Sequence, residues 1–415
     1  MRILIITQNF LPEMGALPNR MYPFAEELAA AGHVVFVVTG MPNYPRGVVF
    51  PGYKAKLFSK EQFGSYTVLR AAYYPVARNK SKWSQALSYL SFLPGAFCNG
   101  LRAGKVDVVL VTSPPLFVGL PAMLLARLRG ARLICDIRDL WPDEIVACGA
   151  ATERSLSVRL VRAMERSIYT RADRICCTTR SFVETVIDRG ADPGKMVYLP
   201  NGADLNLFRP LPADNPVAAR FQMQNRFVAM YSGALGIKHG LATILEAAKL
   251  VEAEKDILFA FVGAGASESE LRASAERMHL SNIMFLGEQK VTDVPSLIAR
   301  ADVCISCLAP SAYFNKIISV KLFEYLACGK PVIGLHSGET ARVLNESGAG
   351  IVVAPGDSFT LAEAIRALYR DSERRARLAS RGRGYIEQNF SRRAIAMQLN
   401  ALLDESPASV MREAA

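Results

Sequence analysis

Lys321 and Glu324 lie three residues apart in a segment whose pattern predicts a helix, ahead of Gly329 and Pro331. Residues with this spacing share one face of a helix. A cation near a helix start favours a phosphate, and a carboxylate one turn further along can accept hydrogen bonds from both hydroxyls of a ribose. The pair therefore has the chemistry of a clamp for a nucleotide sugar. An exposed ion pair on an amphipathic helix explains the same two residues. The motifs in the rest of the chain must therefore distinguish a nucleotide-sugar clamp from a surface ion pair.

Two glycine-rich turns have the composition of anion-binding loops. Gly15 lies between a β-branched run and a helical pattern, while Gly233 and Gly236 follow another apolar run, with Lys238 close behind. Backbone N–H groups in such turns can point at an anion, and glycine lets the backbone approach it. Lys238 would neutralise a bound diphosphate. Taken alone, each loop is also explained by an ordinary turn.

The elements that must position these residues alternate between strand and helix patterns. With 415 residues, 51% of them hydrophobic and 21% charged, the chain is expected to form two soluble globular domains. The alternation predicts an α/β fold in which both domains are doubly wound and Rossmann-like. The expected strands are 3–6, 34–38, 106–112, 133–137, 174–178, 196–199, 227–232, 257–262, 283–286, 303–308, 332–334 and 350–353.

Turn residues at 200–204 and the prolines between 210 and 216 indicate a linker between the two domains. We therefore predict a first domain over 1–204, a second over 205–384, and a helical segment over 385–415 that crosses back to the first. In open α/β domains, ligands bind outside the carboxyl ends of the strands. We therefore expect a ligand of the two domains to bind in the crevice that the carboxyl ends of their strands face.

The positive charge is concentrated in the first half of the chain. The net charge is +11, and residues 1–207 carry +9 of it, from 25 Lys and Arg against 16 Asp and Glu. The basic run 70–82 with interleaved aromatic residues could be a nucleic-acid groove, an anionic membrane contact or a solvated loop. Because no nucleic-acid motif accompanies it, we expect no nucleic-acid partner and favour peripheral contact with an anionic membrane over a nucleic-acid groove. A solvated basic loop explains the run equally well.

Two helical segments, 83–97 and 116–129, carry large apolar side chains beside basic residues, as a peripheral membrane patch would. Ordinary core helices explain the same apolar stripe equally well. The basic residues are Lys80, Lys82, Arg102, Arg127 and Arg129. The apolar stretch 108–126 is long enough to span a bilayer, but its prolines favour a buried strand followed by a helix.

The eight cysteines lie mostly in apolar runs, which is typical of reduced core thiols. Cys304 and Cys307 have a metal-like spacing but lack a second ligand pair, so no metal site is expected. The apolar start of the chain is too short for a signal peptide. Together these features predict a cytoplasmic protein.

Short motifs follow one another in a definite order along the chain. They are Pro12-Glu13-x-Gly15 with Arg20, Gly32-His33-x-Val35, Asp136-x-Arg138-Asp139-Leu140-Trp141-Pro142, Pro200-Asn201-Gly202-x-Asp204 with Phe208, Tyr231-Ser-Gly233-x-x-Gly236-x-Lys238-x-Gly240, Val262-Gly263-x-Gly265, Phe285-Leu286-Gly287 and Lys321-Leu-Phe-Glu324-Tyr. In this order they resemble the retaining GT-B glycosyltransferases of glycosyltransferase family 4 over almost the whole chain. The Arg138 to Pro142 segment is similar to the subgroup that includes the N-acetyl-L-fucosamine transferases of bacterial surface-polysaccharide synthesis.

The resemblance implies a GT-B architecture in which two Rossmann-like domains face across a cleft. It implies transfer of a sugar, with retention, from a nucleotide diphosphate donor to a saccharide or lipid-linked acceptor, without a cofactor. The donor would be UDP-linked, an N-acetylated deoxy amino sugar being one candidate. The implied location is the cytoplasm, at the inner face of the plasma membrane.

The resemblance also assigns roles to single residues. Glu324 would hold the ribose, Lys321 and neighbouring Leu322 would lie near the phosphates, and Gly15, Gly233 and Gly236 would approach the diphosphate or the reacting sugar. Gly263 and the segment from Gly287 to Val294 would line the nucleobase. The catalytic candidates are Lys238, which would stabilise charge on the leaving phosphate, Arg138, and Asp136 and Asp139, which would orient the acceptor or sugar.

The chain departs from the family pattern at two positions. Many members carry a glutamate eight positions before the second one, where this chain has Lys316. Backbone amides of residues 315–317, including Ile317, could then contact the donor sugar instead. Arg138 stands where many relatives have a histidine. A buried Arg138–Asp139 salt bridge beside a core Trp141 is the structural alternative to a catalytic role.

Three other functions share part of the pattern. A UDP-sugar 2-epimerase would share the nucleotide clamp, but it needs acidic and histidine groups for elimination. The scarcity of histidine, four in the whole chain, argues against it. A dinucleotide oxidoreductase would need Gly-x-Gly-x-x-Gly after the first strand, which residues 7–16 lack. A catalytically silent nucleotide-binding partner remains an alternative because the first glutamate is missing.

Overall fold

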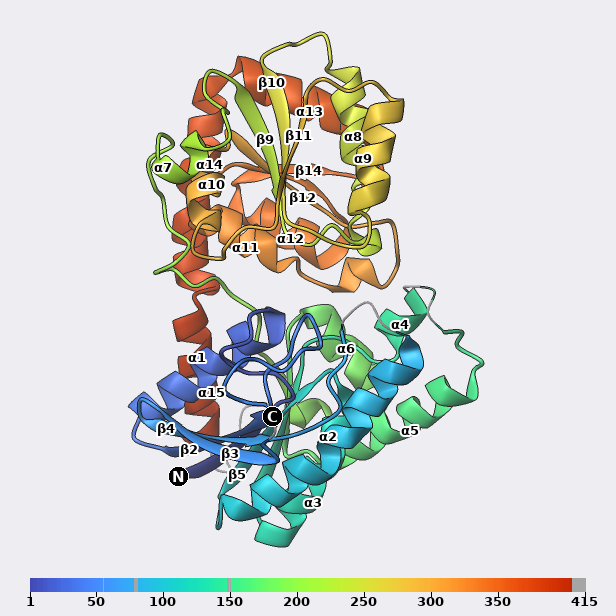
Figure 1. The fold of residues 1–415 in the computed structure, drawn as a ribbon, viewed down its shortest axis with the longest axis vertical. Coiled ribbons are helices and arrows are strands. Elements are labelled where there is room, and N and C mark those ends of the chain that lie inside the picture. The colour runs from blue at the N-terminus through green and yellow to red at the C-terminus, as the bar shows by residue number, and fades with distance from the viewer. Residues whose placement is uncertain (55, 78–80, 148, 150, 405–415) are drawn as a thin grey trace. The chain divides into compact units, whose positions relative to one another are not determined.

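A computed structural model describes residues 1–54, 56–77, 81–147, 149 and 151–404 (Figure 1). The chain divides into two compact units, one of Met1–Pro200 with the segment from Arg393 onward, the other of Asn201–Arg392. The first boundary therefore lies just before the expected one at 204, and residues 385–392 belong to the second unit. Lys80, Cys148 and the expected helical end 405–415 lie outside the described residues.

The first unit is built on a sheet in the order β3-β4-β2-β1-β5-β6-β7-β8. Neighbouring strands are parallel, apart from the antiparallel β3–β4 pair. Their bounds are β1 (Arg2–Ile6), β2 (Val34–Gly40), β3 (Phe58–Phe63), β4 (Tyr66–Ala71), β5 (Val108–Ser113), β6 (Arg132–Ile137), β7 (Arg174–Cys177) and β8 (Met196–Tyr198). The β3–β4 hairpin was not predicted, because β3 is polar and half exposed at the sheet edge.

Helices cover both faces of this sheet, as its central strands β1, β5 and β6, which are buried on both sides, require. On one face, α1 (Ala16–Ala30) and α15 (Arg392–Asp404) pack on Ile3, Ile5 and other buried residues. The helices α2 (Lys82–Arg102), α3 (Gly119–Arg129) and α5 (Leu156–Arg171) lie side by side on the sheet (Figure 1). Two shorter helices of the same unit are α4 (Asp143–Ala147) and α6 (Arg180–Asp188). The helix expected over 116–129 begins with a 3-10 turn, Leu116–Val118.

The second unit has a wholly parallel sheet in the order β11-β10-β9-β12-β13-β14. The strands are β9 (Phe227–Ser232), β10 (Ile257–Val262), β11 (Ile283–Gly287), β12 (Val303–Cys307), β13 (Val332–Leu335) and β14 (Gly350–Val353). The helices are α7 (Pro216–Ala219), α8 (Ala242–Leu250), α9 (Glu268–Arg277), α10 (Val294–Arg300), α11 (Val320–Ala327), α12 (Gly338–Ser347), α13 (Ser358–Arg370) and α14 (Ser372–Asn389). The prediction of two doubly wound α/β domains is confirmed.

Two apolar cores lie on opposite faces of the second sheet. The first contains side chains of α10, α11, α12 and α14, and the second contains those of α8, α9 and α13. Cys304 belongs to the first core and Cys307 to the second. Because an odd spacing along a strand points side chains to opposite faces, these two thiols cannot share a metal ion.

Arg70 corrects one expectation about the basic run 70–82. Its side chain is fully buried at the end of β4, where it forms an ion pair with Glu61 of β3 at 2.9 Å. The guanidinium also lies over the ring of Tyr53 at 5.1 Å. Because the Arg70 charge is buried and paired with Glu61 in the edge hairpin, this residue is not available to contact an anionic surface. Within the described ranges, no helix is both long and apolar enough to span a bilayer.

Candidate active site

The second unit has its topological switch point at β9, whose neighbours β10 and β12 lie on opposite sides. From β9 the chain continues to β10 on one side, and from β12 it continues to β13 on the other, which opens a crevice at the carboxyl ends of β9 and β12. Gly233 comes directly after β9, and the start of α11 follows β12 along the chain. The fold thus brings the glycine-rich turn and the Lys321–Glu324 helix to the same edge of the sheet.

Close backbone packing explains the glycines of this edge. Gly233 and Gly263 have φ angles of +143° and +131°, which favour glycine. A Cβ on Gly263 would lie 2.1 Å from the Gly233 oxygen, and one on Gly265 would lie 2.4 Å from the Leu235 oxygen. The Gly263 N–H donates to the Gly287 oxygen at 2.8 Å. Three of the predicted binding turns therefore form one packed layer.

Lys321 lies within this layer rather than on the helix surface. Its ammonium donates to the Tyr231 hydroxyl at 2.7 Å and lies 4.2 Å from the centre of that ring. The Tyr231 hydroxyl in turn donates to the Ala234 oxygen at 2.8 Å. A Cβ on Gly233 would come within 3.1 Å of the Lys321 Nζ atom. A side chain at position 233 would crowd the end of Lys321, which glycine avoids.

Burial shifts the ionisation of both members of the clamp. Loss of hydration lowers the pKa of Lys321 to about 8, against the opposing influence of Cys307 and Glu324. Loss of hydration also raises the pKa of Glu324 to about 7, partly opposed by Arg392 and Lys321. The Glu324 carboxylate and the Arg392 guanidinium are 3.9 Å apart. The clamp therefore titrates near neutral pH, as groups at binding sites often do.

The chain ahead of α11 is fixed by its contacts with α12. The Ser319 N–H donates to the Thr340 hydroxyl at 3.1 Å, and that hydroxyl donates to the Ile317 oxygen at 2.8 Å. Lys316 ends a 3-10 turn, Phe314–Lys316, and is half-buried like Ile317. These contacts hold the first amides of α11 in a set position, where a helix start favours an anion.

Lys238 lies in a 3-10 turn, Ile237–His239, that follows Gly236. Its backbone oxygen accepts from the Ala309 N–H at 2.9 Å, which ties the turn to the segment after β12. The side chain is half-buried. The same sheet edge thus carries two lysines, Lys238 and Lys321, and the nearby Lys238 charge acts to lower the Lys321 pKa.

Two predicted nucleotide contacts, Leu322 and Val294, pack against the apolar core of the second unit. Leu322 is completely buried in the apolar core, and its N–H donates to the Ser319 oxygen at 3.0 Å. Neighbouring helix residues point about 100° apart, so Leu322 faces the sheet when Lys321 faces the crevice. Val294 begins α10 and packs against the same core. The fully buried Leu322 side chain is not available to a ligand, whereas Val294 is half-buried and its contact with the nucleobase stays a prediction.

In the first unit, the Gly15 loop is held by a buried carboxylate. Glu13 accepts the N–H groups of Asn43 and Tyr44, each at 2.8 Å, and that of Phe10 at 3.2 Å. Burial raises the pKa of Glu13, although these N–H bonds oppose the shift. Gly15 itself precedes the first turn of α1 with a φ of +150°. Glu13 thus couples the loops that follow β1 and β2.

Asp136 belongs to a buried network and does not face a ligand. Arg20 contacts its carboxylate at 2.6 Å and donates to the Leu199 and Pro200 oxygens at 2.8 and 2.7 Å. The Thr112 hydroxyl donates to Asp136 at 3.2 Å and accepts from Arg138 at 2.9 Å. Since Asp136 is fully buried and its oxygens are occupied, its expected contact with acceptor or sugar is corrected to a positioning role.

Arg138 and Asp139 follow directly at the carboxyl end of β6, both half-buried. Burial lowers the pKa of Arg138, with Asp139 the main opposing charge. Beyond them, Trp141 makes edge contacts with Tyr89 and Phe117, at 5.5 and 6.1 Å between ring centres. A charged pair beside an aromatic cluster at this edge can bind a sugar through both polar groups and ring faces.

Sequence reasoning missed four residues that shape these sites. Tyr231 accepts a hydrogen bond from Lys321, but in the sequence it is recognisable only as an aromatic residue just before a glycine turn. Glu13 and Arg20 appeared in a motif without an assigned role. Arg392, close to Glu324, gave no local signal, because it lies far along the chain.

Comparison with known proteins agrees with this architecture. Residues 15–202 match the family model described as "Glycosyl transferase 4-like domain", and residues 218–385 match "Glycosyl transferases group 1". A protein of Escherichia coli K12 named as the colanic acid biosynthesis glycosyl transferase WcaI is 29% identical over 363 residues, covering 86% of this chain and 87% of that protein.

Two solved structures share the fold. Sucrose-phosphate synthase from Thermosynechococcus elongatus superposes with a TM-score of 0.77 and 20% identity, over 97% of this chain and 98% of that one. Anabaena Alr3699/HepE in complex with UDP gives a TM-score of 0.72 and 18% identity, over 97% and 99% of the chains. The two matched domains and the two Rossmann-like sheets together identify this chain as a GT-B glycosyltransferase of family 4.

Proposed function

We propose that this enzyme transfers a sugar from a UDP-sugar to a hydroxyl of a lipid-linked saccharide, with retention at the anomeric carbon. The observation that carries the donor assignment is the Lys321 ammonium under the Gly233 turn, one helical turn from the Glu324 carboxylate. The second unit binds the donor through this pair, and the first unit binds the acceptor. UDP is the first candidate nucleotide because the HepE structure of the same fold contains it.

The proposed chemistry concentrates negative charge on the leaving diphosphate. The bond between the anomeric carbon and the β-phosphate oxygen breaks, and the acceptor oxygen forms the new bond on the same face. The acceptor proton passes to the departing phosphate. Lys238, Lys321 and the first amides of α11 stabilise that phosphate, which is the largest contribution such a site supplies. Arg138 and Asp139 orient the acceptor or the sugar. These cations act in place of a bound metal ion.

The similarity to a protein named for colanic acid biosynthesis supports a role in surface-polysaccharide synthesis. An N-acetylated deoxy amino sugar is the candidate donor group. A lipid-linked acceptor would bring the enzyme to the inner face of the plasma membrane, where it would act from the cytoplasm. Nucleic acid has no part in this function.

A donor screen tests the proposal directly. UDP-, GDP- and dTDP-sugars are compared for thermal stabilisation, since a ligand that binds only the folded state raises the melting temperature. Release of nucleotide from the stabilising donor is then followed with lipid-linked acceptors, with and without EDTA. Transfer that persists in EDTA, and that falls strongly in Lys238→Ala, supports the proposal. Donor binding without transfer to any acceptor would instead favour a catalytically silent nucleotide-binding protein that carries Lys316 in place of glutamate.

A further inference from the structure

The outer side of α2 carries an exposed apolar stripe. Trp83, Leu87, Leu90 and Leu101 follow helical spacing, and Trp83 is 87% exposed. The outward side of a helix in a soluble domain is normally polar. Because these apolar side chains are not buried in the core of the first unit, they do not stabilise its fold. Their exposure indicates an interaction with something outside the unit.

The neighbouring helices α3 and α5 continue this surface. Leu120, Leu124 and Leu128 recur every four residues along α3 and are 41%, 47% and 57% exposed. Leu156 and Leu160 do the same at the start of α5. We call the outward sides of α2, α3 and α5 the leucine face. It runs along the length of three helices that lie side by side on one sheet.

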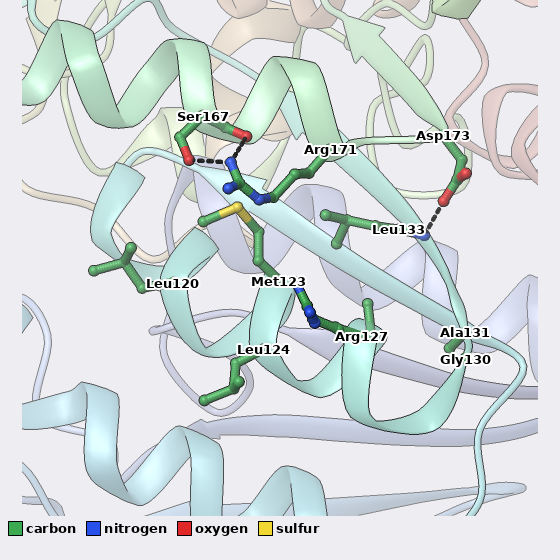
Figure 2. A pocket seen from close by; sticks show the side chains of 11 residues that line it. Leu120, Met123, Leu124, Arg127, Gly130, Ala131, Leu133, Ser167, Arg171 and Asp173 are labelled. Carbon is green, nitrogen blue, oxygen red and sulfur yellow. Dashed lines mark hydrogen bonds between the residues drawn. The ribbon is translucent and has the colours of Figure 1, made fainter.

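A hollow of about 540 Å³ lies within the leucine face, between α3 and α5 (Figure 2). Leu120, Met123 and Leu124 line it with apolar groups, while Arg127 and Arg171 stand at its side. The Arg171 guanidinium donates to the Ser167 oxygen at 3.1 Å, which keeps it beside the hollow. The hollow thus offers an apolar floor with two cations at its edge. The acidic residue of its lining, Asp173, accepts a hydrogen bond from the Leu133 N–H at 2.7 Å.

The charge of this part of the chain is one-sided. Residues 71–135, which include α2 and α3, contain eight Lys and Arg against the single acidic residue Asp107. Neither α2 nor α3 contains an Asp or Glu. A protein partner with an apolar patch would not require this excess, whereas a surface of acyl chains beneath phosphate groups complements it in both respects.

We propose that the leucine face is a docking surface for a bilayer with anionic headgroups. The leucines and Trp83 enter the boundary between headgroups and acyl chains, the hollow between α3 and α5 accepts an acyl segment, and Arg127 and Arg171 contact phosphates. This inference rests on the proposed function, because a lipid-linked acceptor would be presented at the same surface. It adds the face on which the enzyme lies and the residues that hold it there.

Vesicle sedimentation of the full-length protein tests this inference without any substrate. The vesicles are phosphatidylcholine alone, or phosphatidylcholine mixed with an equal amount of phosphatidylglycerol. We expect binding to the mixed vesicles only, weakened about tenfold in Leu120→Ser/Leu124→Ser and by a similar factor in Arg127→Glu/Arg171→Glu. The matched controls Leu250→Ser/Phe359→Ser and Arg374→Glu/Arg377→Glu change exposed residues of the second unit and should bind normally.

Each other outcome overturns the inference. Equal binding of all variants would place the contact elsewhere, and a protein that stays in solution with both vesicles would exclude it. A wild-type dimer that Leu120→Ser/Leu124→Ser converts to a monomer, without vesicle binding, would assign the face to a second copy of the chain. Thermal stabilisation by UDP is measured on every variant, so a failed docking surface and a failed donor site remain distinguishable.

Discussion

The Lys321 ammonium donates to the Tyr231 hydroxyl at 2.7 Å, so a buried cation is held by a neutral partner. Burial raises the pKa of Tyr231 well above its usual value, which keeps the phenol uncharged. Among the residues that the structure describes, no carboxylate forms an ion pair with the Lys321 ammonium to offset its lost hydration, and its lowered pKa reflects this. In the unliganded protein this arrangement is costly, and a bound phosphate would relieve it.

Lys321→Met should therefore separate stability from binding. Without the buried cation, the unliganded protein should be at least as stable as the wild type below pH 8. Its affinity for UDP should fall by roughly 2 kcal/mol, about thirtyfold. Urea unfolding and calorimetric titration measure the two effects, with Lys249→Met on exposed α8 surface as the control. Unchanged UDP affinity would remove Lys321 from the phosphate site.

Glu324→Ala should abolish discrimination between ribose and deoxyribose. If the carboxylate accepts hydrogen bonds from the ribose hydroxyls, the wild type should prefer UDP over deoxy-UDP by about tenfold. The variant should bind both nucleotides with similar, weak affinity. Competition titrations with the two nucleotides give the ratio. A variant that keeps the full preference would show that another group holds the ribose.

Donor affinity should depend on pH as a bell-shaped curve. The Glu324 carboxylate is charged above its pKa of about 7, and the Lys321 ammonium is charged below its pKa of about 8. Affinity for UDP should therefore be greatest between these values and fall on both sides. Glu324→Gln should flatten the acidic limb and Lys321→Met the basic limb. Two unchanged limbs in both variants would assign the titration to other groups.

Gly263→Ala should damage the donor site by a steric clash. The added Cβ would lie 2.1 Å from the Gly233 oxygen, so the two turns must separate. We expect a loss of about 1–3 kcal/mol in unfolding free energy, together with loss of UDP binding. Gly64→Ala is the matched control, since Gly64 also has positive φ but open space around it. If the loss of unfolding free energy is no larger than in the control, the turns at Gly233 and Gly263 can move apart at little cost.

Asp136→Asn should destabilise the first unit by about 3–5 kcal/mol, because it leaves the Arg20 guanidinium buried without its counter-charge. Glu153→Gln, at a partly exposed ion pair with Arg162, should cost less than about 1 kcal/mol. Urea unfolding measures both. UDP affinity, a property of the second unit, should stay unchanged in Asp136→Asn wherever the protein remains folded. A small effect on stability would reopen a direct role for Asp136.

The fold could be predicted where local patterns carry the signal. The expected buried strands are present because β-branched apolar runs between turn residues have few alternatives. The β3–β4 hairpin escaped prediction because its first strand, Phe58–Phe63, is polar at a sheet edge. Leu322 was placed near the phosphates because a motif does not state which side chains face the core.

The network around Asp136 shows the limit of sequence reasoning at the site. A carboxylate at the end of a strand looks free in the sequence, but its partner Arg20 is 116 residues away. The buried environment of Lys321 likewise depends on Tyr231, on a strand 90 residues earlier in the chain. Burial and pairing of this kind arise only from tertiary packing, which local spacing does not encode.

Helix α15 has a consequence for how this protein is made. Ile395, Leu399 and Leu402 of α15 fill the core beside β1 together with residues of α1, so one face of the first sheet lacks part of its cover until α15 has been synthesised. On the ribosome, the middle of the chain, 201–392, emerges complete before that happens. We therefore expect the second unit to reach its native state first during translation, while the amino-terminal residues wait for the last helix.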